Sequence, residues 1–304
     1  MDPRYPRLLE LIGNTPLVEI RRLNPNSKVT VLAKLEGYNP GGSVKARPAL
    51  AMIEAAERSG LLRPGKTVLE PTSGNTGIGI AMVCAIKGYR CLLAMSEGVS
   101  IERRKILAAY GAEFLLTPAD QGTDSAIEKA YEMEREDTEG RYVLLDQYNN
   151  PANPLAHYAT TAPEIWQQTG GAVTHFVATI GTTGTIVGCG RFFKEQNPQI
   201  QVIAGEPSVG HKIQGLKSIK ESYVPGIWEK KWIDRRVIIG DDDAYETTRL
   251  LAKEEGIMCG MSSGAAMWAA LEEAKKLDEG VVVAILPDGG ERYLSTNLFI
   301  APEA

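Results

Sequence analysis

The sequence contains few of the residues from which metal centres are built. Its four cysteines lie far apart and no two form a C-x-x-C pair, and its three histidines share no ligand spacing. Because zinc sites need closely spaced cysteine or histidine ligands, we expect no metal site. Cys84 and Cys91 lie in apolar stretches, where buried, unreactive thiols are common.

The sequence also lacks the features of membrane and nucleic-acid-binding proteins. No apolar run approaches the roughly 20 residues that cross a bilayer. Residues 1–10 are charged and lack the apolar core of a signal peptide. The net charge is −5, so no basic footprint indicates nucleic acid. We therefore expect a cytoplasmic protein that binds neither a membrane nor nucleic acid.

What the sequence does contain is an alternation of short β-branched runs and longer helical patterns. Hydrophobic residues make up 43% of the 304 residues, enough for about two domains of ordinary size. The alternation predicts an α/β fold with mostly parallel, twisted open sheets covered by helices. The expected strands are 29–35, 67–70, 90–95, 113–116, 142–145, 175–179, 201–206 and 281–286. The expected helices are 48–59, 77–87, 101–110, 125–136, 184–196, 242–255 and 263–276.

A domain boundary is expected near residues 147–154, which are rich in turn formers. Two α/β units would then face each other, with a small ligand in the cleft between them. Residues 209–233 form the least regular stretch and are interpreted as a flap over that cleft.

Residues 39–47 (NPGGSVKAR) form a glycine turn that leads into a helix. Ser43 is a candidate N-cap, which would place Lys45 in the first helical turn. A lysine at this positive end of the helix dipole is pushed toward its neutral amine, the form that makes an imine. Taken alone, the segment favours an ordinary solvated lysine.

Residues 71–77 (PTSGNTG) also connect an expected strand to a helix. Their hydroxyls, amide and backbone N–H groups would hold a carboxylate well. The alternative is a simple polar cap, although a single serine or threonine is enough for that purpose.

Residues 181–185 (GTTGT) occupy a third strand-to-helix turn, suited to a phosphate group. The segment lacks the Gly-Lys-Ser/Thr of a P-loop and is not a G-x-G-x-x-G dinucleotide turn. A plain turn is the alternative. A phosphate held without a lysine or a metal-binding acid suggests a cofactor's phosphate. Together with Lys45, this loop points to pyridoxal phosphate.

Residues 260–264 (GMSSG) match the G-x-S-x-G nucleophile elbow of α/β-hydrolases. That fold needs a histidine after the serine, whereas the last histidine here, His211, precedes Ser262. The hydrolase alternative is therefore disfavoured.

Taken in order, these segments resemble the cysteine synthase family (O-acetylserine sulfhydrylases), and its B isozymes in particular, within the tryptophan-synthase β fold type. The resemblance covers nearly the whole chain and rests on motifs at 12–17, 39–45, 71–77, 100–104, 150–154, 181–185, 262–264 and 291–295.

This resemblance implies a fold of two domains, with residues 39–148 as a smaller, mobile, substrate-binding domain. Residues 1–38 and 149–304 would form a larger domain that binds the cofactor phosphate. The resemblance also implies a role for each site residue. Lys45 would bind the cofactor as an imine and move the α-proton, Asn75 would bond the ring hydroxyl oxygen, and Ser262 would face the ring nitrogen. The substrate carboxylate would be bound by Thr72, Ser73, Thr76 and Gln147, and the cofactor phosphate would be held by Gly181, Thr182, Thr183, Gly184 and Thr185.

The implied reaction makes L-cysteine from O-acetyl-L-serine, or O-phospho-L-serine, and sulfide through an α-aminoacrylate intermediate. Serine-using formation of cystathionine or cysteine, cysteine desulfhydration, and a catalytically silent scaffold are the alternatives. The family implies a homodimer, and serine acetyltransferase is not predicted as a partner.

Three positions depart from the family pattern or vary within it. Ala46 follows the lysine where the family usually has aspartate. Lys217 stands where B-type relatives carry an arginine near the leaving group, and a cation there would suit an anionic leaving group such as phosphate. A solvated lysine is the alternative at this position. Pro287 replaces a cysteine or similar residue of some B-type enzymes, which leaves the sulfur donor open.

Overall fold

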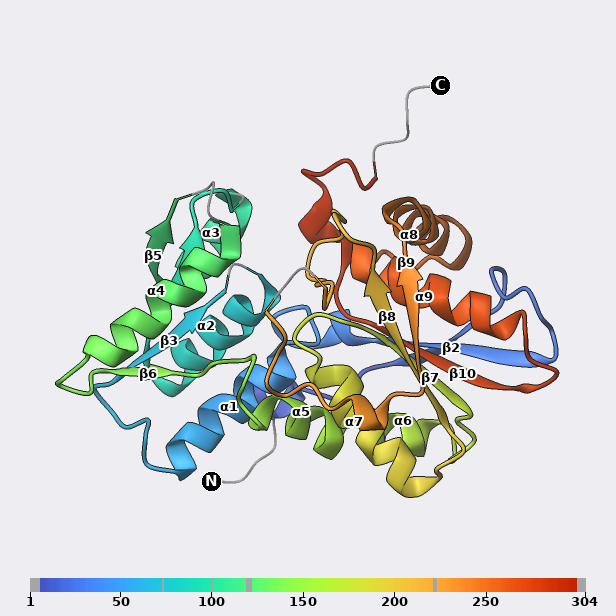
Figure 1. The fold of residues 1–304 in the computed structure, drawn as a ribbon, viewed down its shortest axis with the longest axis horizontal. Coiled ribbons are helices and arrows are strands. Elements are labelled where there is room, and N and C mark those ends of the chain that lie inside the picture. Colours follow the sequence, from blue (N-terminus) through green and yellow to red (C-terminus); the bar gives the residue numbers. More distant parts are fainter. Residues whose placement is uncertain (1–5, 73, 100, 119–121, 221–222, 300–304) are drawn as a thin grey trace. The chain divides into compact units, whose positions relative to one another are not determined.

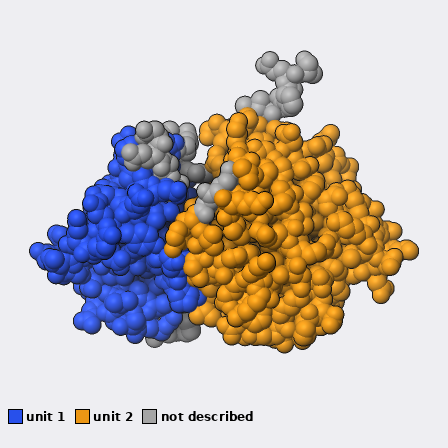
Figure 2. All heavy atoms as spheres, in the orientation of Figure 1, with its two compact units in different colours: residues 1–12, 45–153 blue, residues 13–44, 154–304 orange. Residues whose placement is uncertain are grey.

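The computed structural model describes residues 6–72, 74–99, 101–118, 122–220 and 223–299. The chain divides into two compact units, shown in different colours in Figure 2. The first unit contains residues 1–12 and 45–153, and the second contains residues 13–44 and 154–304. The divisions fall after residues 12, 44 and 153, whereas the predicted domain boundaries fall after residues 38 and 148, so the predicted domains stay a prediction.

The first unit is built on a four-stranded parallel sheet with the strand order β5-β4-β3-β6 (Figure 1). Its strands are β3 (Thr67–Pro71), β4 (Arg90–Ser96), β5 (Glu113–Thr117) and β6 (Tyr142–Leu144). Its helices are α1 (Ala46–Arg58), α2 (Asn75–Lys87), α3 (Ile101–Ala109) and α4 (Gly122–Glu136). A short 3₁₀ helix, Leu8–Leu11, precedes them.

Alternating residues of these strands pack against helices on opposite faces of the sheet. Val68 and Leu93 belong to a core with α1, α2 and α3, whereas Leu69 and Ala94 pack with Ala126 and Ala130 of α4. Strands that bury both faces are nearly continuous apolar runs, which explains why β3 and β4 were recognisable in the sequence.

The second unit contains a six-stranded sheet with the order β1-β2-β10-β7-β8-β9, in which only the pairing of β1 with β2 is antiparallel. Its strands are β1 (Leu17–Ile20), β2 (Val29–Leu35), β7 (His175–Thr179), β8 (Gln201–Pro207), β9 (Arg235–Ile239) and β10 (Gly280–Leu286). Its helices are α6 (Ala162–Gln168), α7 (Gly184–Gln196), α8 (Asp241–Glu255) and α9 (Met261–Ala274). Helix α5 (Ala152–Ala156) and a π-helix (His157–Thr161) lead into α6, and 3₁₀ turns occur at Glu36–Tyr38, Lys230–Trp232 and Gly290–Tyr293.

Helices cover both faces of this second sheet. One core joins β2, β10 and β7 to α8 and α9, and the other joins the opposite face of β10, β7 and β8 to α6 and α7. The expected α/β class, with two mostly parallel sheets covered by helices, is confirmed. Among the described residues, no helix combines the length and apolar character needed to cross a membrane.

One local prediction is wrong. Ser43 does not cap α1, because the N-cap residue is Lys45 and the helix begins at Ala46. Ser43 is instead buried and forms an isolated antiparallel bridge with Asp288. Lys45 therefore stands at the entrance of α1 and not inside its first turn.

Candidate active site

The segment 71–77 connects the end of β3 to the start of α2, where backbone N–H groups are free of intrahelical partners. Gly74 is the N-cap and no side chain caps this helix end. Thr72 and Thr76 are buried, and Asn75 is half-buried as the first helical residue. Ser73 lies outside the described residues. Hydroxyls and backbone donors at a positive helix end form a site suited to a carboxylate.

Gln147 lies beside this segment although it is 71 positions beyond Thr76. It follows β6, which pairs in parallel with β3, so both strands end at the same edge of the sheet. The Thr76 hydroxyl donates to Gln147 Oε1 at 2.7 Å, and Asn153 Nδ2 donates to the Gln147 carbonyl at 2.7 Å. Two of the residues predicted to hold a substrate carboxylate therefore form one buried group.

Lys45 enters the same unit at the start of α1 and is half-buried. A Cβ atom at Gly79 of α2 would lie 2.9 Å from the Lys45 carbonyl oxygen and 3.0 Å from Ala49 Cβ. Because Gly79 has no side chain, α1 and α2 approach closely at this point. The backbone of Lys45 thus packs against α2 about one helical turn after Asn75.

In the second unit, the segment 181–185 connects β7 to α7. Thr183 is the N-cap of α7 in a left-handed conformation, with φ of 73°. Its Oγ1 atom is buried and has no hydrogen-bond partner in the described part of the chain. A Cβ atom at Gly181 would lie 2.8 Å from the Gly215 carbonyl oxygen, so glycine is needed there. An orphaned buried hydroxyl at a helix N-terminus fits a phosphate oxygen.

A valine at position 183 tests this fit, because valine keeps the shape of threonine and removes only the hydroxyl. We expect Thr183→Val to weaken pyridoxal phosphate binding by about 10- to 100-fold, the effect of losing one hydrogen bond to a charged group. The melting temperature of the cofactor-free protein should stay unchanged, since Thr183 Oγ1 has no partner in the described part of the chain. Equilibrium dialysis measures the affinity, and the exposed Thr30→Val is the matched control. An unchanged affinity would contradict the assignment.

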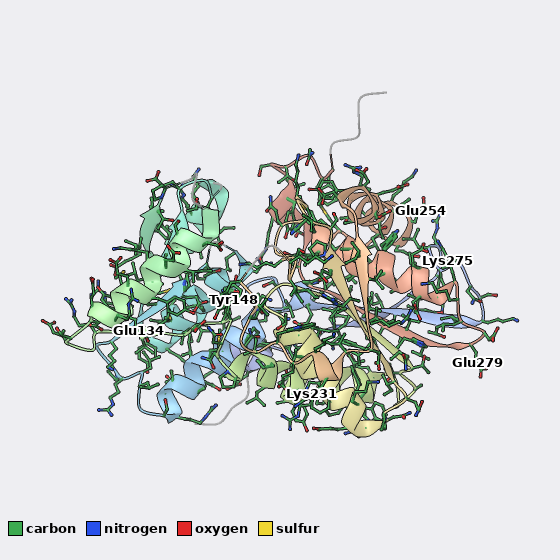
Figure 3. The ribbon with its side chains drawn as sticks, in the orientation of Figure 1. Glu134, Tyr148, Lys231, Glu254, Lys275 and Glu279 are labelled. Carbon is green, nitrogen blue, oxygen red and sulfur yellow. The ribbon has the colours of Figure 1, made fainter. Side chains whose placement is uncertain are left out.

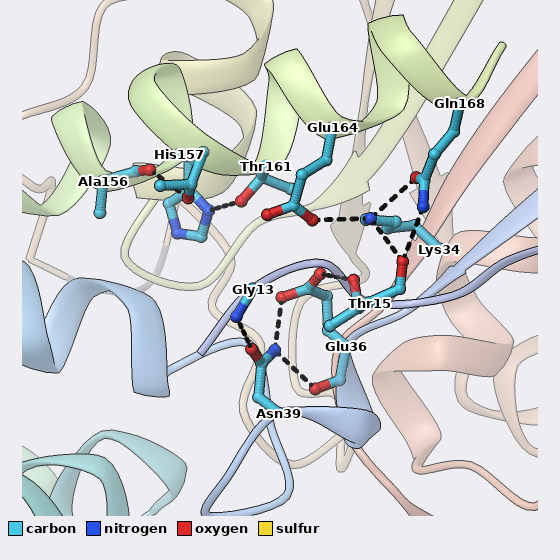
Figure 4. A network of polar contacts seen from close by, with 11 residues as sticks. Gly13, Thr15, Lys34, Glu36, Asn39, Ala156, His157, Thr161, Glu164 and Gln168 are labelled. Atoms are coloured by element: carbon cyan, nitrogen blue, oxygen red, sulfur yellow. Dashed lines mark hydrogen bonds and ion pairs between the residues drawn. The ribbon is translucent and has the colours of Figure 1, made fainter. Parts of the chain in front are cut away.

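His157 is a component of the site that sequence reasoning missed. It is fully buried in the π-helix, with Nδ1 2.9 Å from Thr161 Oγ1 and Nε2 3.3 Å from Thr185 Oγ1 (Figure 4 shows the first contact). The side chain therefore orients the last threonine of the segment 181–185. No local spacing could have revealed it, because the two residues are 28 positions apart. A π-turn inside a helix is itself frequent at functional sites.

Ser262 lies in the first turn of α9 and is 5% exposed. The residue before this helix, Gly260, has no room for a side chain, because a Cβ atom there would meet Asp288 and Tyr293. The Tyr293 hydroxyl donates to Asp288 Oδ2 at 2.7 Å. This pair packs against Gly260, the N-cap residue that precedes the turn containing Ser262.

A buried polar network connects the sequence motifs at 12–17 and 39–45 beside strand β2 of the second unit. Lys34 Nζ is within 2.7 Å of the Thr15 carbonyl, 2.8 Å of Glu164 Oε2 and 2.9 Å of Gln168 Oε1 (Figure 4). The Thr15 hydroxyl donates to Glu36 Oε1, and Asn39 Nδ2 donates to Glu36 Oε2. Residues 13–15 are thereby fixed against the start of the loop that leads to Lys45.

The predicted residues divide between the two units. Lys45, Thr72, Asn75, Thr76 and Gln147 belong to the first, whereas residues 181–185, Ser262 and Lys217 belong to the second. Lys217 is half-buried, and its backbone N–H donates to the Ile180 carbonyl at 2.9 Å. This hydrogen bond holds the end of the segment 211–217 beside residues 181–185, the loop suited to a phosphate.

Comparison with known proteins agrees with these observations. A family model described as pyridoxal-phosphate dependent enzyme matches residues 8–288. Cysteine synthase B of Pseudomonas aeruginosa is 48% identical over 299 residues, which cover 98% of this chain and 99% of the relative. Cysteine synthase B of Escherichia coli is 50% identical over 292 residues, or 96% of this chain and 95% of the relative. The chain belongs to the cysteine synthase family of pyridoxal-phosphate-dependent enzymes.

Solved structures of this family have the same fold. The cysteine synthase of Entamoeba histolytica superposes with a TM-score of 0.93 at 39% identity, covering 100% of this chain and 94% of the other. An O-ureido-L-serine synthase superposes with a TM-score of 0.92 at 41% identity, covering 99% and 98%. The family thus includes members that are named for different products.

The residues present fit pyridoxal phosphate. The segment 181–185 offers an unpaired buried hydroxyl and a helix N-terminus to a phosphate. Ser262 offers a neutral hydroxyl, and Lys45 offers an amine at the entrance of a helix. This donor set contains no cluster of acidic residues or histidines, which matches a cofactor held through its phosphate.

Proposed function

We propose that the chain makes L-cysteine from O-acetyl-L-serine and sulfide. The observation that carries the proposal is the presence of two helix-entrance sites, a carboxylate-type site in the first unit and a phosphate-type site in the second, in a chain about half identical to two cysteine synthases. Product analysis after incubation of the purified holoenzyme with both substrates tests it. Failure to form cysteine, while the cofactor is bound, would refute it.

The proposed chemistry assigns a separate task to each group of residues. Bound pyridoxal phosphate supplies an electron sink for the negative charge that develops on the substrate α-carbon. The Lys45 amine would hold the cofactor covalently, remove the substrate α-proton and later return it. Thr72, Ser73, Thr76 and Gln147 hold the substrate carboxylate.

The other assigned residues hold the cofactor. Asn75 bonds its ring hydroxyl oxygen, and the residues 181–185 hold its phosphate. A hydroxyl at Ser262, in place of a carboxylate, leaves the ring nitrogen nearly uncharged. Weak stabilisation of negative charge at the α-carbon would favour loss of the β-substituent, and hence replacement, over transamination.

A second candidate donor, O-phospho-L-serine, is favoured by Lys217. Its backbone is fixed beside residues 181–185, and an ammonium there could pair with a phosphate leaving group. We expect Lys217→Ala to raise the KM for O-phospho-L-serine by about 10- to 100-fold, with little change for O-acetyl-L-serine. Steady-state kinetics with both donors measure the difference, and the exposed Lys212→Ala in the same segment is the control. An equal effect on both donors would remove O-phosphoserine from consideration.

The remaining alternatives are distinguished by their substrates. Stopped-flow absorbance with O-acetyl-L-serine, O-phospho-L-serine and serine identifies the donor whose β-substituent is expelled fastest. Sulfide released from cysteine would indicate desulfhydration instead. We further propose that the enzyme is a cytoplasmic homodimer and that residues 39–148 move as the substrate-binding domain.

A further inference from the structure

Glu70 is a fully buried carboxyl group in β3, two residues before Thr72. The Gln147 backbone N–H donates to Glu70 Oε1 at 3.3 Å, whereas Oε2 has no hydrogen-bond partner in the part of the chain that the structure describes. A buried carboxyl group with only one of its two oxygens hydrogen-bonded destabilises the folded protein, so its presence here needs a physical explanation.

Within the described part of the chain, the titratable groups that interact with Glu70 are acidic. They are Asp146 and Tyr148 on the segment after β6, and Cys91 on β4. Burial, with a smaller repulsion from Asp146, raises the pKa of Glu70 to about 8. Burial likewise raises the pKa of Tyr148, labelled in Figure 3. A carboxyl that is buried and repelled by a neighbouring carboxylate is most stable with its proton on.

The contacts of Glu70 lead directly to the carboxylate-binding group. Glu70 bonds the backbone of Gln147, and the Gln147 side chain accepts from Thr76. Gln147 follows Asp146, whose φ of 53° is unusual for a residue with a side chain. The Asp146 carboxylate is fixed by Tyr131 and Asn149, so this turn is held from both sides. A change of charge at Glu70 would thus act on Gln147 first.

We propose that neutral Glu70 is a positioning residue that holds Gln147 for the substrate carboxylate, and that loss of its proton prevents carboxylate binding. The inference rests on the proposed function for the role of Gln147 and Thr76. An ionised Glu70 would place a negative charge below the carboxylate site, where the low dielectric strengthens repulsion. It would also draw the Gln147 N–H closer, since hydrogen bonds to charged acceptors are shorter.

The test is calorimetric binding of 3-acetoxypropionate, the donor without its amine, to the holoenzyme. This ligand cannot displace Lys45, and its carboxylate stays ionised from about pH 6 to 9.5. We expect a constant dissociation constant up to about pH 8 and a rise of about tenfold per pH unit above it. Glu70→Gln, which is always neutral, should keep the low-pH affinity at every pH.

Glu134→Gln is the matched control. Glu134 lies on α4 of the same unit (Figure 3), and partial burial, with a smaller repulsion from Asp146, raises its pKa. No hydrogen bond or ion pair between described residues joins it to Glu70 or Gln147. It should follow the wild-type profile. A wild-type affinity independent of pH, an alkaline loss that persists in Glu70→Gln, or no binding at any pH would overturn the inference.

A measurement on the unaltered enzyme covers the case in which Glu70→Gln fails to fold. The infrared carbonyl band of a protonated carboxyl should persist at neutral pH and disappear as the pH passes about 8, in step with ligand affinity. Its absence at neutral pH would overturn the inference. Cysteine synthesis is measured separately. If binding depends on pH but no cysteine forms, only the proposed reaction is refuted. If cysteine forms normally but binding does not depend on pH, only the role of Glu70 is refuted.

Discussion

Lys45→Ala is expected to abolish cysteine formation and to remove the visible absorbance of the protein. The lysine amine performs both proton transfers of the proposed reaction, and one positioned acid–base group contributes about 10²–10⁴-fold to a rate. Loss of the covalent attachment adds to this, so we expect kcat to fall by at least about 10⁴-fold. The absorbance spectrum and the rate of cysteine formation are the two measurements.

The control for this variant is Lys105→Ala, an exposed lysine on α3 of the same unit. It should retain both absorbance and activity. Added cofactor should still bind to Lys45→Ala through residues 181–185, though without the covalent bond to the protein. If Lys45→Ala kept a lysine-bound cofactor spectrum, another lysine would have to be the attachment point.

The free energy of unfolding is expected to fall as the pH rises from about 4.5 to about 8. The pKa of Glu70 rises from its ordinary value of 4.5 to about 8 on folding, chiefly because of burial. Between these values the folded chain keeps a proton that the unfolded chain has released, so higher pH favours unfolding. The contribution is on the order of a few kcal/mol and is complete once the pH exceeds about 8.

Chemical denaturation at a series of pH values measures this slope. Glu70→Gln should flatten it and should be the more stable protein at pH 8 and above, whereas Glu134→Gln should keep most of it. Equal slopes for the wild type and Glu70→Gln over this interval would mean that Glu70 is ionised in the folded chain.

The regular elements with buried faces could be predicted from the sequence, and the exceptions have physical causes. The bounds of β2, β7 and α7 agree with the predictions, because each begins or ends at a clear turn signal. The strands β1 and β9 were missed since both are edge strands; β9 buries only Ile239, and its two arginines face solvent. Edge strands lack the apolar pattern that central strands need.

Prolines caused the main errors in the helices. Helices α5 and α6 were not predicted, and residues 147–154 were taken as a turn-rich boundary. Pro154 and Pro163 nevertheless lie in the first turns of α5 and α6, where a missing N–H costs little. Pro48 was predicted to begin α1, but the helix begins two residues earlier, at Ala46. Pro48 therefore lies in the first turn, where its missing N–H costs little. Proline marks the neighbourhood of a helix start more reliably than the starting residue itself.

The site was predictable where its residues are adjacent in the chain, as in the segments 71–77 and 181–185. The supporting residues were not, because His157 reaches Thr185 and Glu70 reaches Gln147 only through the fold. The resemblance to cysteine synthases identified Gln147, which no local pattern could have done. The roles assigned to Lys45 and the other site residues stay predictions.

The path of the chain through the two units has an evolutionary consequence. Residues 45–153 form one uninterrupted insert between the parts of the second unit, 13–44 and 154–304, and this insert carries Lys45, Thr76 and Gln147 together. Recombination at its two ends would exchange the residues predicted to bind the amino acid in one event, while residues 1–12 of the first unit and the residues predicted to hold the phosphate stayed in place. Relatives named for different products could therefore diversify by replacing a single cassette of sequence.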